Sequence, residues 1–268
     1  MKSKLTILVM SACVIASILC STLFSVVQVG REEIERRVVG CSVQVVSSTD
    51  AGAVAGSGVV FKLKDGKTYI LTAGHVVENA IEVKTDWVKD KEGEEKEVKK
   101  RVFNDVWVVI ERVKDDITTA EVRLRCKIVF YKQVEEEGGH DVAVLEPYEG
   151  DMLPYGARPL PSDRKVYAGQ PVYHVGSLEG MLTNSVTFGV VSAPVRMYKN
   201  ASFIQLSTPA RPGSSGGGIF VVEDDGKCYY AGMLTRGSGE TINLAVPLFR
   251  IRQALKEANL EKILDEAQ

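Results

Sequence analysis

The chain has 268 residues and a formal net charge of −2. This length fits one large domain or two small ones. The near-neutral charge gives no reason to expect nucleic acid as a partner.

The N-terminal segment at residues 5–29 contains no charged residue and follows Lys2 and Lys4. As a helix it would be about 37 Å long, enough to cross a hydrocarbon core of about 30 Å with some tilt. The apolar region of a signal peptide is usually shorter, about 7–15 residues, and no clear small-residue cleavage site follows this one. We therefore interpret residues 1–30 as a retained signal anchor, with a cleaved signal peptide as the alternative.

After a short linker of mixed charge at residues 31–37, the sequence has a β pattern. A strong hairpin turn, Asp65-Gly66, separates two short apolar runs. Alternation of apolar and basic residues predicts another half-buried strand from Val122 to Phe130. The other predicted short strands are residues 38–46, 58–63 and 68–72.

Residues 84–101 carry seven basic and six acidic residues. A segment so charged and yet nearly neutral is typical of a solvated surface. We interpret it as a hairpin or loop extension rather than as a partner-binding device.

Five cysteines do not predict a disulfide framework. Cys13 and Cys20 lie in the apolar N-terminal segment, which leaves Cys41, Cys126 and Cys228. Three cysteines permit at most one bridge, and spacing alone identifies no pair. Each is flanked by strand-like residues, so we expect small buried hydrophobes. No spacing typical of metal ligands occurs, and we predict neither a metal nor a cofactor.

Three strand ends carry residues suited to nucleophilic catalysis. His75 lies in a small-residue turn after residues 69–72, and Asp141 begins the apolar run 141–145. Ser215 lies in the segment PGSSGGG at residues 212–218, where glycines allow backbone N–H groups to converge on one point. A structural glycine turn is the alternative for this segment alone. The order His, Asp, Ser is that of chymotrypsin.

These motifs resemble trypsin-like serine proteases of the HtrA/Deg type, and the resemblance covers about residues 40–255. It implies an all-β fold of two six-stranded antiparallel β-barrels, chymotrypsin-like, with the catalytic residues in the cleft between them. The stretches that carry it, in the family's order, are residues 56–61, 70–77, 141–145, 172–176, 186–193, 204–205, 212–217 and 245–247.

The two barrels of this interpretation have a proline-rich connection between them. The first barrel would span residues 38–146, the connection 147–161 and the second barrel 162–247. Leu248, Ile251, Leu255 and Ala258 follow helical spacing, so a terminal helix over residues 248–266 should pack on the second barrel. Many Deg-type proteases carry a PDZ domain after this point, and we expect none in these 268 residues.

The resemblance also assigns roles to the site residues. Ser215 would be the nucleophile, His75 the base that takes its proton, and Asp141 the group that orients the imidazole. The N–H groups of Gly213 and Ser215 would form the oxyanion hole.

The chain has two further histidines. His140 adjoins the predicted acid, and neighbouring strand residues point to opposite faces, so the two cannot easily share the cleft. His174 lies inside a strand and is expected to be packed.

The primary specificity pocket follows from the resemblance as well. Pro209 stands six positions before Ser215, where a trypsin has an acid for Lys or Arg. With Ala210, Leu234, Leu244 and Ala245 nearby, the pocket is expected to be small and apolar. We therefore expect cleavage after modest aliphatic residues.

The resulting hypothesis is a serine endopeptidase that hydrolyses unfolded or exposed polypeptide segments through an acyl-enzyme. The membrane would hold it through residues 5–29, with the protease domain outside the cytoplasm, or the protein would be secreted or periplasmic after signal cleavage. A catalytically silent binding module and a chaperone-like peptide binder are the alternatives. HtrA-type proteases are often homo-oligomers, but no motif in this chain establishes one.

Activation by cleavage after Arg37 is not expected, although residues 37–40 (RVVG) resemble a zymogen cleavage site. The new Val38 ammonium would need an acidic partner immediately before the nucleophile, because a buried ammonium without one is strongly disfavoured. That position is Ser214, which supplies no charge.

Overall fold

The computed structural model describes most of the chain after the N-terminal apolar segment. The described residues are 29–49, 52–89, 91, 94–114, 117–133, 141–153, 155–237 and 242–268. Within these ranges no helix is both long and apolar enough to cross a membrane. Residues 1–28, which include most of the predicted anchor as well as Cys13 and Cys20, lie outside them.

The first barrel is a closed antiparallel sheet with the strand order β1-β2-β3-β8-β7-β6. The β-branched and aliphatic side chains on its inner face, such as Val45, Val60, Ile70 and Leu145, are fully buried. The predicted strand at residues 68–72 is found with those bounds as β3. The strands are β1 (Ser42–Thr49), β2 (Gly52–Lys62), β3 (Thr68–Thr72), β6 (Val106–Lys114), β7 (Ile117–Lys132) and β8 (Val142–Pro147).

The second set of strands closes in the order β10-β11-β14-β13-β12-β9. Phe220 and Tyr230 of this set are fully buried and stack edge to face, with ring centroids 5.8 Å apart. The short helix η3 (Gly150–Met152) lies in the connection between the two sets. The strands are β9 (Pro171–Leu178), β10 (Leu182–Tyr198), β11 (Ala201–Leu206), β12 (Gly218–Val222), β13 (Cys228–Gly237) and β14 (Asn243–Pro247).

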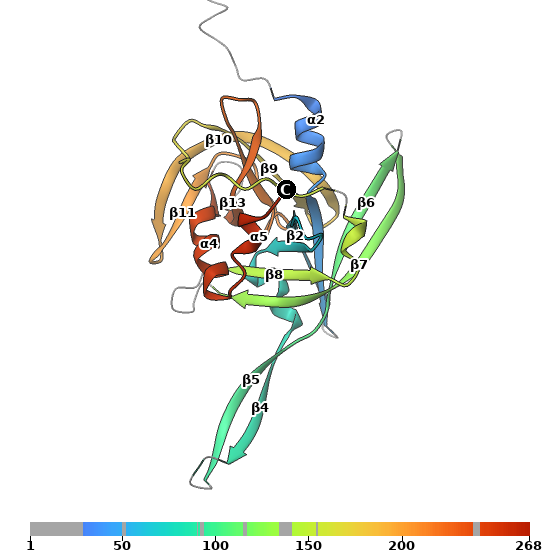
Figure 1. Cartoon of the computed structure of the whole chain (residues 1–268), viewed down its shortest axis with the longest axis vertical. Coiled ribbons are helices and arrows are strands. Elements are labelled where there is room, and N and C mark those ends of the chain that lie inside the picture. The colour runs from blue at the N-terminus through green and yellow to red at the C-terminus, as the bar shows by residue number, and fades with distance from the viewer. Residues whose placement is uncertain are drawn as a thin grey trace, which may run out of the picture.

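The charged segment at residues 84–101 lies in a two-stranded hairpin of β4 (Ile81–Lys89) and β5 (Glu95–Phe103), which confirms the solvated-hairpin interpretation. The hairpin extends well beyond the body of the molecule (Figure 1). Trp87 and Val83 are 67% and 61% exposed, because neither face of the ribbon is covered.

The N-terminal end of the described chain is helical, so the predicted linker at residues 31–37 and the predicted strand start at Val38 are wrong. The segment forms α2 (Arg31–Ile34) and the π-helix η1 (Glu35–Val39), and the first strand begins only at Ser42. Residues that are remote in sequence hold this helical segment in place. Glu33 Oε1 accepts hydrogen bonds from Arg158 Nη1 (2.8 Å) and from the Cys228 N–H (2.9 Å).

Arg37 also holds this segment in place. Its Nη1 donates to the carbonyl oxygens of Gly156 (3.0 Å) and Gln268 (2.8 Å), and the following Val38 is fully buried. The peptide bond after Arg37 therefore lies in a helical turn, whereas a protease needs an extended, accessible substrate.

The C-terminal segment forms two helices rather than the single one predicted at residues 248–266. These are α4 (Leu248–Glu257) and α5 (Lys262–Asp265). Asn259 interrupts the helix because its φ of 56° is left-handed, a conformation that asparagine tolerates better than most residues. Ile251 and Leu255 are fully buried on the core side of α4, as their spacing predicts.

The three cysteines that the structure describes, Cys41, Cys126 and Cys228, are free and buried, as the sequence predicts. Burial raises the pKa of each thiol, to about 12 for Cys126 and Cys228. They therefore stay protonated and pack as small hydrophobes.

Candidate active site

The side chain of His75 is bound to that of Asp141. His75 lies on α3 (Gly74–Val77), the short helix that follows β3 and leads into η2 (Glu78–Ala80), and Asp141 immediately precedes β8. His75 Nδ1 is 2.9 Å from Asp141 Oδ2, and the His75 N–H donates to Asp141 Oδ1 at 2.9 Å. The Asp141 side chain is 5% exposed and that of His75 42%. The carboxylate is thus fixed inside the protein, and the imidazole reaches solvent.

Asp141 stays ionised despite its burial. Desolvation alone would raise its pKa, but hydrogen bonds from His75, the charge of His75 and a hydrogen bond from Thr235 together hold the pKa below its usual range. Thr235 Oγ1 donates to Oδ2, the same oxygen that faces the imidazole. The sequence does not predict this role of Thr235, because a threonine in a buried strand has no signal of its own.

The loop that carries Ser215 needs its glycines. Gly213 and Gly216 both have φ of 86°, a left-handed conformation that side chains rarely adopt. A Cβ on Gly213 would collide with the carbonyl oxygen of Ser177, and one on Gly216 with that of Ser57. The glycines therefore allow the loop to lie directly against both neighbouring strands.

Two N–H groups of this loop have no hydrogen-bond partner among the described residues, and the peptide that carries each is fixed. The Pro212 carbonyl accepts from the Glu179 N–H at 2.7 Å, which orients the N–H of Gly213. The Ser214 carbonyl accepts from the Gly217 N–H at 2.9 Å, which orients the N–H of Ser215. Neither Gly213 N–H nor Ser215 N–H donates to any described oxygen. These are the donors that the sequence predicts for an oxyanion hole.

Ser57 of β2 connects the first barrel to the nucleophile loop. Its Oγ donates to the Gly213 carbonyl and accepts from the Ser177 N–H, both at 2.7 Å. Its N–H donates to the Ser215 carbonyl, and its own carbonyl accepts from Thr72 Oγ1, again at 2.7 Å each. Ser57 itself is fully buried, so its groups in these bonds are shielded from water.

Ser215 and His75 are brought to the same place by β2. A Cβ on Gly56 would lie 2.6 Å from Val76 and 3.1 Å from the Ser215 carbonyl, so the residue after His75 and the nucleophile loop meet at Gly56. Among the described residues, Ser215 Oγ makes no hydrogen bond with His75. In proteases without substrate such bonds are often longer than in complexes.

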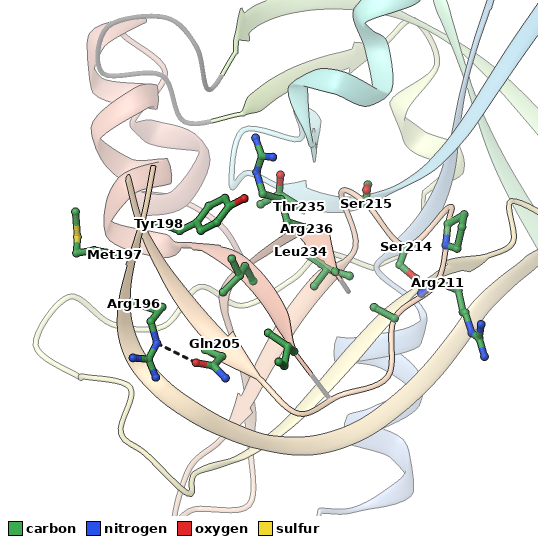
Figure 2. A pocket seen from close by; sticks show the side chains of 15 residues that line it. Arg196, Met197, Tyr198, Gln205, Arg211, Ser214, Ser215, Leu234, Thr235 and Arg236 are labelled. Carbon is green, nitrogen blue, oxygen red and sulfur yellow. Dashed lines mark hydrogen bonds between the residues drawn. The ribbon is translucent and has the colours of Figure 1, made fainter. Parts of the chain in front are cut away.

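A cavity of about 870 Å³ opens beside Ser215 (Figure 2). Of the predicted pocket residues, Ala210, Leu234 and Leu244 line it. Pro209 and Ala245 are not among its described lining residues: the Pro209 carbonyl accepts from Thr187 Oγ1 at 3.1 Å, and Ala245 is fully buried.

The cavity is larger than the sequence predicts, and it is not purely apolar. The additional polar walls come from Arg196 and Gln205 at the β10–β11 end and from Arg236 on β13. These residues are remote from Ser215 in sequence, and only the closure of the sheet brings them to the site.

Of the two other histidines, only His174 lies within the described residues, and it does not take part in the bound pair. His174 is fully buried, as expected, and its Nδ1 lies 3.3 Å from Thr187 Oγ1. His140 lies outside the described residues. In the described part of the chain, no group of three His, Cys, Asp or Glu side chains is placed to hold a metal.

Comparison with known proteins supports the family that the motifs resemble. Residues 56–229 match the family model of the trypsin-like peptidase domain. No curated protein sequence matches the chain. This family match covers more than half of the 268 residues, so the chain belongs to the trypsin-like peptidase domain family.

Solved structures agree in fold. The serine endoprotease from Yersinia pestis is 21% identical with a TM-score of 0.57, and the match covers 85% of this chain and 65% of that one. The HtrA-type protease AlgW, solved with a tripeptide, is 20% identical with a TM-score of 0.57, covering 85% and 62%. At these identities the likeness shows the fold alone, and the chain spans less than two thirds of the length of either protein.

Proposed function

We propose that this protein is a serine endopeptidase in which Ser215, His75 and Asp141 form the catalytic triad. The observation that carries the proposal is the convergence of a bound histidine–carboxylate pair with a serine loop that presents two free, oriented N–H groups. Membership of the trypsin-like peptidase domain family supports the same reaction.

In the proposed reaction, Ser215 Oγ attacks the scissile carbonyl while His75 Nε2 takes its proton. Asp141 accepts from the imidazole Nδ1–H, which leaves Nε2 free as the base and stabilises the imidazolium that forms. The N–H groups of Gly213 and Ser215 stabilise the tetrahedral oxyanion. His75 then protonates the leaving amine, and water hydrolyses the acyl-enzyme by the same steps.

We also propose cleavage after modest aliphatic residues in unfolded or exposed segments. The part of the cavity beside Ser215 supports this preference, because Ala210, Leu234 and Leu244 line it. No described acidic residue lines the cavity to bind a Lys or Arg side chain.

Labelling with a fluorophosphonate followed by peptide mapping tests the reaction and the nucleophile together. The probe should modify Ser215 alone, since only an activated serine attacks it. Absence of labelling in folded protein, or modification of another serine, would overturn the proposal.

Membrane anchorage through residues 5–29 and an extracytoplasmic protease domain are part of this proposal and rest on the uncharged N-terminal run. The full-length protein should remain in membranes after carbonate extraction. A mature N-terminus between Ser21 and Gly30 would instead indicate a cleaved signal peptide.

A further inference from the structure

The cavity beside Ser215 has a cationic side that the proposed aliphatic preference does not use. Arg196, Arg211 and Arg236 line it, and no aspartate or glutamate does among the described lining residues. In Figure 2 the Arg211 guanidinium points away from the other lining side chains. Arg196 and Arg236 line other parts of the same cavity.

Arg236 is a charged side chain placed at the edge of the catalytic group. It follows Thr235, whose hydroxyl binds Asp141, and the register of β13 against β14 shifts between Leu234 and Arg236. Such a shift re-aims neighbouring side chains and is common beside active sites. The Arg236 Nε is buried and has no hydrogen-bond partner among the described residues. An unpaired N–H of this kind is costly in the free protein.

Arg196 is the second cation, on the opposite wall. Its Nε donates to Gln205 Oε1 at 2.9 Å, a neutral partner that does not balance the charge (Figure 2). No described carboxylate forms an ion pair with Arg196 or Arg236, whereas Arg158, Arg164 and Arg252 elsewhere on the body each have one.

The backbone next to Arg236 can hold an extended peptide. β13 pairs with β12 only as far as Met233, whereas its pairing with β14 on the other side continues to Gly237. The edge of residues 235–237 is thus without a neighbouring strand among the described residues. A peptide that adds to this edge would pass Arg236 after leaving Ser215.

We propose that Arg236 is a specificity residue that binds an acidic side chain of the substrate, upstream of the residue that fills the apolar part of the cavity. A guanidinium and a carboxylate form a bidentate, charge-assisted hydrogen-bonded pair. Arg196 adds to the positive potential of the same cavity. This inference rests on the proposed function and narrows its substrates to peptides with an aliphatic residue at the cut and an acidic residue before it.

Binding to a variant that cannot cleave tests the inference apart from catalysis. Fluorescein-labelled peptides with one Val, and with Glu, Gln or Lys at each upstream position in turn, would be titrated into Ser215→Ala and followed by anisotropy. At one position the Glu peptide should bind about tenfold more tightly than the Gln peptide. Arg236→Gln, combined with Ser215→Ala, should remove this difference, and Arg236→Glu should favour Lys.

Lys227→Gln is the matched control. It removes one positive charge from the surface turn before β13, at the opposite end of that strand from Arg236. The preference for the Glu peptide should remain in this variant. Equal binding of Glu and Gln peptides at every position, or a preference that survives Arg236→Gln, would overturn the inference. Failure of fluorophosphonate labelling in the native protein would instead count against the proposed function, so the two failures are distinguishable.

Discussion

The nucleophile loop and the β4–β5 hairpin are both exposed to solvent in part, yet they are held in opposite ways. The loop at residues 212–217 is fixed by hydrogen bonds to Ser57, Glu179 and Leu234, which are remote in sequence. The hairpin has regular pairing between its own strands and extends beyond the body (Figure 1). Hydrogen bonds from several parts of the chain fix the geometry of the loop, so it can hold reacting groups in place. The hairpin is held by hydrogen bonds between its own two strands, so its side chains can be changed without disturbing those groups.

The largest effect should come from the nucleophile. Ser215→Ala should reduce cleavage of an unfolded casein-like substrate by at least about 10⁴-fold, because no other group there replaces Oγ as nucleophile. Ser214→Ala should retain most activity, since the Ser214 Oγ only accepts from the Arg211 N–H. Thermal unfolding should show that both variants fold. If Ser214→Ala abolished cleavage and Ser215→Ala did not, the nucleophile would be Ser214, one residue earlier in the motif.

The next effect tests whether the hydrogen bonds of Ser57 position the loop. Ser57→Ala removes the partner of the Gly213 carbonyl and of the Ser177 N–H, each of which it binds at 2.7 Å. We expect kcat to fall by about 10–100-fold, with the free energy of unfolding lowered by about 1–3 kcal/mol.

Thr68→Val is the control for Ser57→Ala, because Thr68 is a buried residue of the same barrel whose hydroxyl, among the described residues, donates only to the Gly150 carbonyl. It should leave kcat unchanged. If Ser57→Ala lowered stability but left kcat of the folded protein intact, Ser57 would have a structural role only.

The third test concerns the buried His174 beneath the loop, 2.7 Å from where a Gly217 Cβ would lie. Burial lowers its pKa to about 4 from an ordinary 6.5. Between these values the unfolded chain binds more protons, so the free energy of unfolding falls as pH falls from about 6.5 to about 4. The loss should be on the order of 3 kcal/mol.

Urea unfolding across this pH range measures the effect of His174. His174→Asn has no titrating ring, so its stability should depend less on pH in this window, whatever its absolute value. Parallel curves for the two proteins would contradict the assignment of this pH dependence to His174.

The smallest effect is expected in the hairpin. Trp87→Ala removes a side chain that is 67% exposed and pairs across the ribbon with Glu97. The free energy of unfolding should change by less than about 0.5 kcal/mol, and peptide cleavage should not change. A large loss of cleavage would show that the hairpin takes part in binding the substrate and would remove the contrast between the two regions.

Local chemistry determines much of this protein from the sequence alone. β-Branched runs predict strands such as β3, and the apolar spacing of Ile251 and Leu255 predicts the buried face of α4. The order His75, Asp141, Ser215 and the glycines around the serine predict the candidate site. Each of these signals lies within a few neighbouring residues.

Tertiary structure alone decided the features that depend on residues distant in the chain. Thr235 and Arg236 have ordinary strand sequences, and Ser57 lies in a stretch that carries the family resemblance but gives no signal for the bonds it makes. All three become part of the site only where two sheets meet. The helical segment at residues 31–37 is held against the body because Glu33 and Arg37 find partners about 120 residues or more away. The physical reason is that a local signal depends only on neighbouring residues, whereas each of these hydrogen bonds joins groups that meet only in the folded chain and contributes about 0.5–1.5 kcal/mol there.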